Sequence, residues 1–430
     1  MLSTLITAGT SELAADTGAR RAYVALALVF AAVITVFSVI PVYNGLRGST
    51  KDYGLWYRTG QRVLEGGEVY HSVDGAFEFI YPPPAAVLLA PLSALGRLAL
   101  IAILGLINTA AWTTCIFMSV YLATGRVWRQ SPWLYAVPTL CTAPYASNMY
   151  LLGQPNLLLL ACLLSAFAFL RHKREWGAGA LIAFAAAIKA FPVLAVFYCM
   201  YRRHWKTTLS TIVFLVFFLV LMPAPWRGFQ RNLDDLKTWA TGMGFNYQSN
   251  TFAQRTGRAY SYKNQSLIGL ANRLLRPVEA NEVDGRPVTV NVANLGFQQV
   301  NAVIVAVGLA LCLFYVTSMP PRSQRSPQSD AIECAMLVLL ILVFSPLSYQ
   351  YFFVWLLYPL TLAMNSFLTA PLGSRERTGM LVWIVVCVLL LSLALPFPHH
   401  WLAEAYGNNF VAALLLLAGF GWKLRRVRSA

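Results

Sequence analysis

The chain has 430 residues, of which 58% are hydrophobic and only 12% are charged, and its formal net charge is +16. A soluble domain contains about 45–50% apolar and about 25% charged residues, so this composition excludes an ordinary soluble protein and indicates an integral membrane protein. Several apolar runs are long enough to cross a bilayer as helices. Segments with the alternating pattern of a transmembrane β-barrel are absent from the sequence.

The excess of basic residues is spread over short clusters beside the apolar runs, as at residues 171–174, 202–206 and 423–428. Clusters of this kind orient membrane helices and contact anionic lipid head groups. They therefore predict a chain that contacts the lipid bilayer and has no nucleic-acid partner.

The first apolar run, residues 22–42, follows two arginines and predicts a retained span that leaves the cytoplasm. Residues 43–97 then form a first exterior loop. Within this loop we expect an amphipathic helix over residues 53–64 and a proline-marked apolar segment over residues 82–95. That segment is short for a crossing, so it predicts a re-entrant or interfacial helix.

The remainder of the chain predicts further crossings and one long exterior loop, residues 225–298. The expected crossings lie near residues 98–122, 133–150, 155–170, 207–224, 299–319, 334–349, 351–372, 379–396 and 408–422. They predict one all-α domain, residues 1–430, built as a polytopic transmembrane helical bundle of about 10–12 helices. The positive-inside rule places both termini, including a basic tail at 423–430, in the cytoplasm and the first exterior loop outside the plasma (inner) membrane.

Residues 177–201 form an apolar run with cations at both flanks, interrupted midway by Lys189-Ala190-Phe191-Pro192. Each half spans only about 18 Å as a helix, which is too short for a crossing. A helical hairpin that returns to the cytoplasm satisfies the positive-inside rule better than a single crossing, and it carries Lys189 at its apex.

Two charged residues are the main candidates for chemistry. Asp52 lies in the first exterior loop, where a carboxylate near a hydroxyl acts as a general base, although a helix cap is the alternative interpretation. Lys189 is the only charged residue inside a predicted span. An intramembrane cation usually marks function and stabilises developing negative charge, but snorkelling or support of the helix break explains it equally well.

Polar residues elsewhere suit sugar or phosphate. Gln154 and Asn156 face the same side as Asp52 in this topology, and they either bind sugar hydroxyls or cap the helix that follows. In the long loop, Arg255, Arg258 and Lys263 lie near tyrosines and amides, which suits a phosphate and a sugar or, alternatively, a solvated surface.

Five short motifs run along the chain. They are Asp52-Tyr53 to Tyr81-Pro82-Pro83, Gly153-Gln154-Pro155-Asn156, Ala187-Ile188-Lys189-Ala190-Phe191-Pro192, Asn264-Gln265-Ser266-Leu267 and Ser345-Pro346-Leu347-Ser348-Tyr349. In this order, over roughly residues 50–360, the sequence resembles the bacterial polyprenyl-phosphate-mannose-dependent α-mannosyltransferases, glycosyltransferase family 87 of the C-type glycosyltransferase superfamily.

The resemblance implies a bundle of C-type glycosyltransferase architecture and an active site at the extracytoplasmic face. It implies transfer of a hexose, expected to be mannose, from a polyprenyl-phosphate donor to a hydroxyl of an envelope glycolipid or glycan acceptor. Asp52 would be the general base of an inverting single displacement. We expect no metal and no cofactor, because neither C-x-x-C pairs nor paired exterior carboxylates at metal spacing occur.

Two further groups of residues complete the predicted site. The expected donor-phosphate contacts are Lys189, Arg255, Arg258, Lys263 and Arg58. The expected sugar and acceptor contacts are Tyr53, Tyr57, Tyr81, Gln154, Asn156, Asn264, Gln265, Tyr349, Gln350 and Tyr351.

The chain departs from the family pattern at Tyr351-Phe352, where many relatives carry a histidine pair, so a histidine contact to the donor phosphate is in doubt here. Two rival functions remain open. One is a transporter or flippase of lipid-linked sugars, against which stand the missing midplane acid pairs and the absence of obvious inverted repeats. The other is an inactive scaffold subunit of an envelope glycan assembly system.

Overall fold

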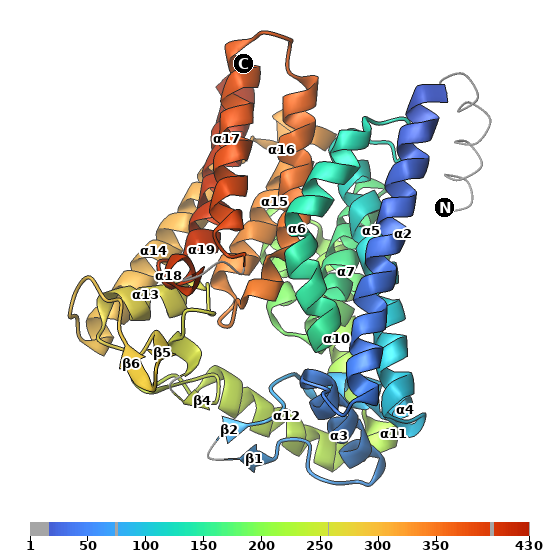
Figure 1. The fold of residues 1–430 in the computed structure, drawn as a ribbon, viewed down its shortest axis with the longest axis vertical. Helices are drawn as coiled ribbons and strands as arrows, with labels where there is room; N and C mark the ends of the chain where they lie inside the picture. Colours follow the sequence, from blue (N-terminus) through green and yellow to red (C-terminus); the bar gives the residue numbers. More distant parts are fainter. Residues whose placement is uncertain (1–16, 74–75, 257, 396–399, 430) are drawn as a thin grey trace.

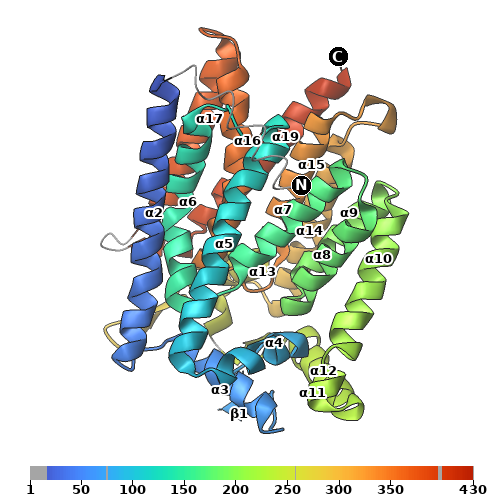
Figure 2. The ribbon, with the colours of Figure 1, turned by 90° about the vertical axis from the view of Figure 1, so that its right-hand side faces the viewer.

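The computed structural model describes residues 17–73, 76–256, 258–395 and 400–429. The chain forms a bundle of long helices with a layer of shorter helices and hairpins at one end (Figure 1). The first helix begins, and the last helix ends, at the opposite end of the bundle (Figure 2). Both ends of the described chain therefore lie on the same side.

Apolar helices make up the bundle. They are α2 (Thr17–Leu46), α5 (Arg97–Thr124), α6 (Pro132–Leu152), α7 (Asn156–Arg171), α8 (Glu175–Ile188), α9 (Ala195–Tyr201), α10 (Trp205–Val216), α14 (Phe297–Ser318), α15 (Pro327–Phe344), α16 (Leu357–Thr369), α17 (Arg375–Ser392) and α19 (Asn408–Ser429). Short turns of other helix types, η2 (Phe191–Leu194), η3 (Phe217–Leu221), η5 (Arg322–Gln324) and η6 (Gln350–Leu356), extend or join them.

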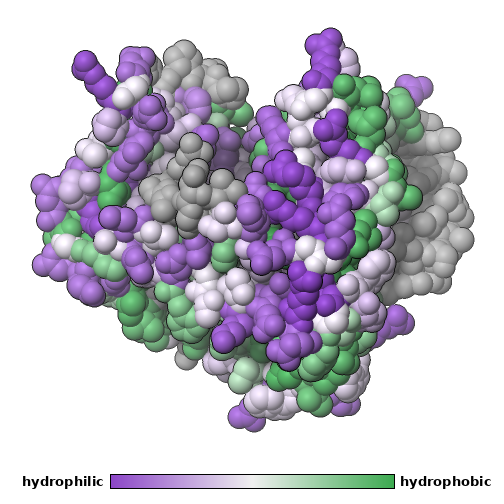
Figure 3. Space-filling view, turned by 90° about the horizontal axis from the view of Figure 1, so that it is seen from below, coloured by the Kyte–Doolittle hydropathy of each residue, from purple (hydrophilic) through white to green (hydrophobic). Residues whose placement is uncertain are grey.

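Short elements form the layer beneath the bundle, which we call the end layer. They are α3 (Asp52–Leu64), β1 (Ser72–Val73), β2 (Ala76–Phe77), α4 (Pro83–Ala94), α11 (Ala224–Arg227), α12 (Phe229–Gly244), β3 (Thr251–Phe252), β4 (Arg255–Thr256), η4 (Arg258–Tyr260), α13 (Leu267–Leu275), β5 (Asn281–Val283), β6 (Arg286–Val288) and α18 (His400–Ala405). The strands pair only as three antiparallel hairpins among the described residues. Seen from this end, the surface is largely hydrophilic, with hydrophobic residues toward its edge (Figure 3).

The predicted polytopic all-α membrane fold is confirmed. Within the described part of the chain, six helices are long and apolar enough to cross a membrane, at residues 21–46, 97–124, 205–227, 297–318, 327–344 and 350–369. Each overlaps a crossing expected from the sequence, although the crossing expected at 334–349 is displaced to 327–344, because the chain turns at Ser345-Pro346. The helices α6, α7, α17 and α19 occupy the other four expected positions.

Helix α3 forms where the sequence predicts an amphipathic helix. Its buried residues include Tyr53, Trp56, Gly60 and Val63, which recur every three or four positions and so form one face. This face packs on α4, the predicted re-entrant or interfacial segment, which lies beside α3 in the end layer (Figure 2). The first residues of α3 are thereby fixed against the bundle.

The segment from α8 to α9 is the expected helical hairpin. Helix α8 ends at Lys189, whose backbone is extended, and η2 then starts the return. The two ends of the hairpin lie together, because His204 is 3.8 Å from the carboxylate of Glu175 and Ser210 donates a hydrogen bond to the Trp176 carbonyl at 2.7 Å. The hairpin therefore places Lys189 at its apex, toward the end layer.

Candidate active site

Asp52 lies in the first turn of α3, where its carboxylate contacts the corner between α6 and α7. Its Oδ2 accepts a hydrogen bond of 2.7 Å from the side-chain amide of Gln154, 102 residues further along the chain. The residue before the helix, Lys51, forms no side-chain cap. Asp52 is thus positioned by a long-range contact between the end layer and the bundle.

Tyr81 holds the other end of the Gln154 amide. The tyrosine hydroxyl donates to Gln154 Oε1 at 2.6 Å, so the amide is oriented with its NH₂ group toward Asp52. Tyr81 is itself fixed, because the hydroxyl of Tyr70 donates to its carbonyl at 2.7 Å and Trp56 packs edge-on against its ring. These three groups, Asp52, Gln154 and Tyr81, form a connected chain of hydrogen bonds.

Gly153 allows this corner to approach α3. Its φ angle is +67°, a left-handed conformation that glycine adopts without steric cost. A Cβ atom at this position would lie only 2.5 Å from the Cε1 atom of Tyr53. The Tyr53 ring is buried, and its hydroxyl donates to the Tyr150 carbonyl at 2.6 Å, so it cannot move aside easily. Tyr53 therefore helps to hold the neighbouring Asp52 in position.

Lys189 approaches the same corner from the apex of the hairpin. Its ammonium donates to Asn156 Oδ1 at 3.2 Å and lies between 5.2 and 5.8 Å from the ring centroids of Tyr81, Phe191, Tyr351 and Phe352. Aromatic faces stabilise a cation at these distances. Asp52 lies within electrostatic reach of this ammonium group. The structure therefore combines a carboxylate, two amides and a cation in one site.

Asn156 begins α7 but does not cap it, since its carbonyl oxygen Oδ1 is engaged by Lys189. Its backbone carbonyl accepts a hydrogen bond of 2.8 Å from the indole of Trp355 in η6. The side-chain Nδ2 is buried and has no hydrogen-bond partner among the described groups. A buried donor in that state costs about 1–3 kcal/mol unless a ligand or water satisfies it, so it suits a binding site.

An apolar groove of about 270 Å³ opens beside these polar groups. Gln154, Tyr81 and Asn108 contribute polar groups to its wall, which otherwise consists mainly of apolar side chains, among them leucines of α4 and α5 and Ile188. A few polar groups in a mainly apolar wall suit an amphiphile whose head group lies near Asp52 and Lys189.

Tyr349 and Tyr351 adjoin the site on the η6 side, with ring centroids 5.9 Å apart. The first two residues of the Asn264-Gln265-Ser266-Leu267 motif instead form hydrogen bonds to backbone carbonyls. Asn264 donates to the carbonyls of Ala259 and Pro346, while Gln265 donates to those of Tyr262 and Glu404. The structure thus gives this motif a role in joining the end layer to η6.

Other predicted contacts have partners outside the group formed by Asp52, Gln154 and Lys189. Arg58 is more than half exposed and pairs with Glu78 at 3.4 Å, and Lys263 is exposed beside the Tyr262 ring. Gln350 accepts from Asn148 and donates to the Ala394 carbonyl.

The structure says less about the surroundings of three other predicted residues. Tyr57 is half-buried on α3. The side chains of Arg255 and Arg258 lie outside the described part of the structure.

A buried pair that the sequence does not single out lies next to the Asn264-Gln265 motif. Arg273 is fully buried and donates to backbone carbonyls including those of Ser261 at 2.8 Å and Ala405 at 2.8 Å. Glu404 is 3% exposed, and its Oε1 has no hydrogen-bond partner among the described groups. Burial raises the pKa of Glu404 to about 7, although the nearby Lys263 and Arg273 lower it.

A polytopic helical bundle with a polar site at one end and an apolar groove beside it is the arrangement of an integral membrane enzyme. The sequence model of glycosyltransferase family 87 matches residues 79–346, which is more than half of the chain. The chain belongs to this family and is a multi-pass membrane glycosyltransferase.

The chain is also similar to glycosyltransferases with assigned activities. The chain is 24% identical over 388 residues to a polyprenol-phosphate-mannose-dependent α-(1-2)-phosphatidylinositol mannoside mannosyltransferase of Mycobacterium tuberculosis, covering 84% of this chain and 81% of the relative. It is 27% identical over 390 residues to the corresponding phosphatidylinositol pentamannoside enzyme of Mycolicibacterium smegmatis, covering 85% and 83%. It is also 25% identical over 173 residues to an α-(1->3)-arabinofuranosyltransferase of Corynebacterium glutamicum, covering 39% and 41%.

Proposed function

We propose that this protein transfers mannose from a polyprenyl-phosphate donor to a hydroxyl of an envelope glycolipid or glycan. The observation that carries the proposal is the position of Asp52, which is within electrostatic reach of Lys189 and is held by Gln154, a residue that lines an apolar groove. The two mannosyltransferase relatives, whose names specify a polyprenol-phosphate-mannose donor and a phosphatidylinositol mannoside, support the choice of donor and acceptor class.

The groove receives the first isoprene units of the donor, and the polar groups beside it receive the phosphate and the sugar. Lys189 then lies where negative charge develops on the departing phosphate, and its positive charge lowers the barrier electrostatically. The unpartnered Nδ2 of Asn156 supplies a hydrogen bond to the phosphate or the sugar. The ring of Tyr351 lies over the same ammonium group, 5.8 Å from Lys189 Nζ to its centroid, and so borders the space proposed for the phosphate.

The reaction is a single displacement at the anomeric carbon. The acceptor oxygen forms the new C–O bond while Asp52 takes the hydroxyl proton, and the bond from the anomeric carbon to the phosphate oxygen breaks. Both electrons of that bond leave with the polyprenyl phosphate. One displacement inverts the configuration, so a β-linked donor gives an α-linked product.

The topology supports an active site on the extracytoplasmic side of the plasma membrane. Both ends of the described chain lie opposite the end layer, and the basic residues 171–174 and 202–206 lie at turns on that opposite side. Because basic loops remain in the cytoplasm, this arrangement supports cytoplasmic termini and an Asp52 site on the outer side.

The test is transfer by the purified full-length chain in lipid vesicles, with radiolabelled polyprenyl-phosphate-mannose and a phosphatidylinositol mannoside acceptor. We expect labelled product from the wild type and a loss on the order of 10² to 10⁴ in turnover for Asp52→Asn, because a positioned general base contributes that much. Glu65→Gln, an exposed change at the other end of α3, is the matched control. Wild-type turnover by Asp52→Asn removes the residue from the mechanism, and labelled donor that crosses the vesicle without transfer supports a flippase.

A further inference from the structure

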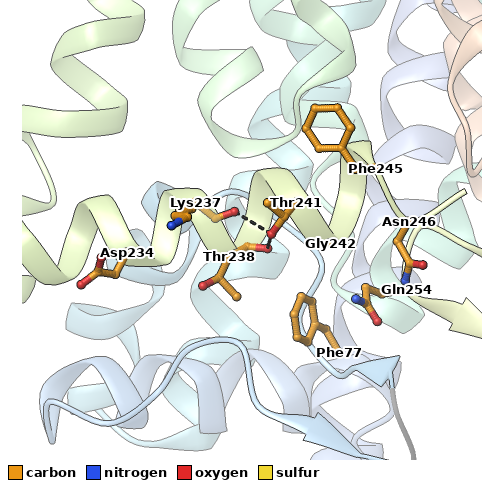
Figure 4. Close-up of a pocket in the computed structure, with 9 residues that line it drawn as sticks. All are labelled: Phe77, Asp234, Lys237, Thr238, Thr241, Gly242, Phe245, Asn246 and Gln254. Atoms are coloured by element: carbon orange, nitrogen blue, oxygen red, sulfur yellow. Dashed lines mark hydrogen bonds between the residues drawn. The ribbon is translucent and has the colours of Figure 1, made fainter.

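A second pocket lies in the end layer, outside the site built around Asp52. Its volume is about 590 Å³, and it forms where the last turns of α12 meet β2 and the turn between β3 and β4. Figure 4 shows Phe77 on one side of this pocket, with polar side chains of α12 and of the following loop around it. We call it the α12 pocket.

Phe77 packs closely against α12 because residue 242 of that helix is a glycine and has no side chain. A Cβ atom on Gly242 would lie 2.6 Å from Cε2 of Phe77 and 3.3 Å from Cγ of Gln254. Only glycine therefore lets the aromatic ring and the β3–β4 turn approach the helix together. The ring also packs against Tyr70, with centroids 5.6 Å apart, so its position is fixed from the other side.

Gln254 lines the pocket, and its backbone has an unfavourable conformation. It and Ala253 are the two turn residues between β3 and β4, and both have positive φ angles, 60° and 45°. Hairpin turns of this kind favour Asn-Gly, because glycine and, to a lesser degree, asparagine adopt the left-handed region readily, whereas it costs most other residues about 1–2 kcal/mol each. A strained non-glycine residue that lines a pocket points to a role for its side chain.

Several polar groups of the α12 pocket are available to a ligand, although the Asp234 carboxylate also accepts a 3.5 Å hydrogen bond from Gln230. Among the described residues, the side-chain amides of Asn246 and Gln254 form no hydrogen bond, and Lys237 has no carboxylate partner. The Thr241 hydroxyl donates to the Lys237 carbonyl at 2.9 Å, which leaves its lone pairs open to a donor. Amides, a hydroxyl and a charged group of each sign, the acid being Asp234, therefore surround one aromatic ring.

We propose that the α12 pocket binds a sugar unit of the acceptor glycan, away from the bond that is made. The apolar C–H face of a pyranose ring packs on Phe77, and its vicinal hydroxyls donate to and accept from Asn246 and Gln254. Lys237 and Asp234 together give the pocket no excess charge, which favours a neutral sugar over a phosphate. The inference rests on the proposed function and extends it by assigning an elongated glycan as the acceptor.

One continuous segment links the α12 pocket to the active site. Phe77 and Tyr81 are four residues apart, so their Cα atoms are separated by at most about 14 Å. The rings of Phe79 and Tyr81 stand 5.5 Å apart, and Tyr70 contacts both Phe77 and Phe79. A short oligosaccharide that reaches Asp52 with its terminal hydroxyl spans this distance.

The test compares a long and a short acceptor. Steady-state transfer is measured with phosphatidylinositol mannosides that carry one and several mannose units, and binding of a soluble linear mannan oligosaccharide is measured by saturation-transfer NMR. For Phe77→Ala we expect KM for the long acceptor to rise about 10-fold, the loss of one aromatic contact, with kcat unchanged and no change for the short acceptor. Phe229→Ala, an exposed aromatic of α12 that does not line the pocket, is the matched control.

Gln254→Gly separates binding from folding. This change removes backbone strain, so the unfolding temperature should stay the same or rise while oligosaccharide binding weakens. Equal KM values for Phe77→Ala and wild type on the long acceptor overturn the inference, as does displacement of the oligosaccharide by vesicles of anionic phospholipid. A wild-type enzyme that binds the oligosaccharide but transfers no mannose to either acceptor refutes the proposed function alone.

Discussion

Two regions of the molecule each bring a carboxylate and a cation together, and they do so in different ways. At the end opposite the end layer, Arg202 and Glu333 are both buried and pair directly, with Nε 2.8 Å from Oε2 and a second contact to Oε1. In the active site, Asp52 accepts from the amide of Gln154 and Lys189 donates to the amide of Asn156.

The difference separates a structural ion pair from the arrangement that we propose to be catalytic. Arg202 also donates to the Pro320 carbonyl at 3.1 Å. This pair therefore joins the α9–α10 turn to α15, and its two charges serve to hold the fold together. The amide of Gln154 orients Asp52 and the amide of Asn156 orients Lys189, and these amides are neutral. A base and an electrostatic stabiliser need their charges for the substrate.

The largest effect should follow from breaking the structural pair. Arg202→Met leaves the Glu333 carboxylate buried without its partner, and we expect a loss of about 3–5 kcal/mol in the free energy of unfolding. Turnover per folded molecule should be unchanged, since neither residue lies in the active site. Thermal unfolding in detergent and a transfer assay on the surviving folded fraction measure the two quantities.

The double variant Arg202→Met/Glu333→Leu is the control for this prediction. It removes both charges, and replacement of a buried ion pair by apolar groups is often neutral or stabilising. Stability of the double variant should therefore return close to that of the wild type. A double variant as unstable as the single one would mean that packing, and not the unpaired charge, explains the loss.

Breaking the catalytic arrangement should instead affect turnover. Lys189→Met keeps the length of the side chain and removes its charge, so we expect kcat/KM to fall by a factor on the order of 10² to 10³, as for the loss of one electrostatic stabiliser. Stability should not fall, because an ammonium group no longer has to be removed from water. Lys173→Met, an exposed change on the α7–α8 turn, is the matched control. Full activity in Lys189→Met would contradict the assigned role.

Glu404 offers a third test, with a smaller expected effect. It is a buried carboxyl group, and among the described residues its Oε1 accepts a hydrogen bond from neither a cation nor an amide. Its pKa is raised from 4.5 to about 7 in the folded protein, so folding is favoured when it is protonated. That stabilisation is complete below its ordinary pKa and is lost as the pH rises through about 7, a change on the order of 1 kcal/mol between about pH 6 and about pH 8.

The measurement is the unfolding temperature of the full chain as a function of pH. Wild-type stability should decrease across this range, and Glu404→Gln, which does not titrate, should show a flatter profile. The groups close enough to influence Glu404 are Lys263, Arg273, Tyr145 and Tyr262. An unchanged slope in Glu404→Gln would assign the pH dependence to another group.

Local patterns in the sequence were sufficient for much of the fold. The spacing of Tyr53, Trp56 and Val63 predicts α3, and the interruption at Lys189 within an apolar run predicts the hairpin that places it. Both are properties of short segments. The candidate cation could therefore be chosen from its place in an apolar run, whereas local pattern left Asp52 open between a general base and a helix cap and the family resemblance favoured the base; the structure brings the two residues within electrostatic reach of each other.

The connections between distant segments could not be predicted in this way. Gln154 and Asp52 are 102 residues apart, and Arg202 and Glu333 are 131 residues apart. In the sequence Arg202 is one of several basic residues beside a span, and nothing local distinguishes it from its exposed neighbour Arg203. The Asn264 side chain likewise suits a sugar by composition, yet its hydrogen bonds hold backbone segments together.

The contact between Gly153 and Tyr53 has a consequence for how this enzyme tolerates change. Each residue is the immediate chain neighbour of a member of the active site, Gln154 in one case and Asp52 in the other. A single added methyl group at Gly153 would push the two neighbours apart while every reactive group stayed intact. A bulkier residue at this one tight corner could therefore disturb the candidate active site without any of its proposed reactive side chains being lost.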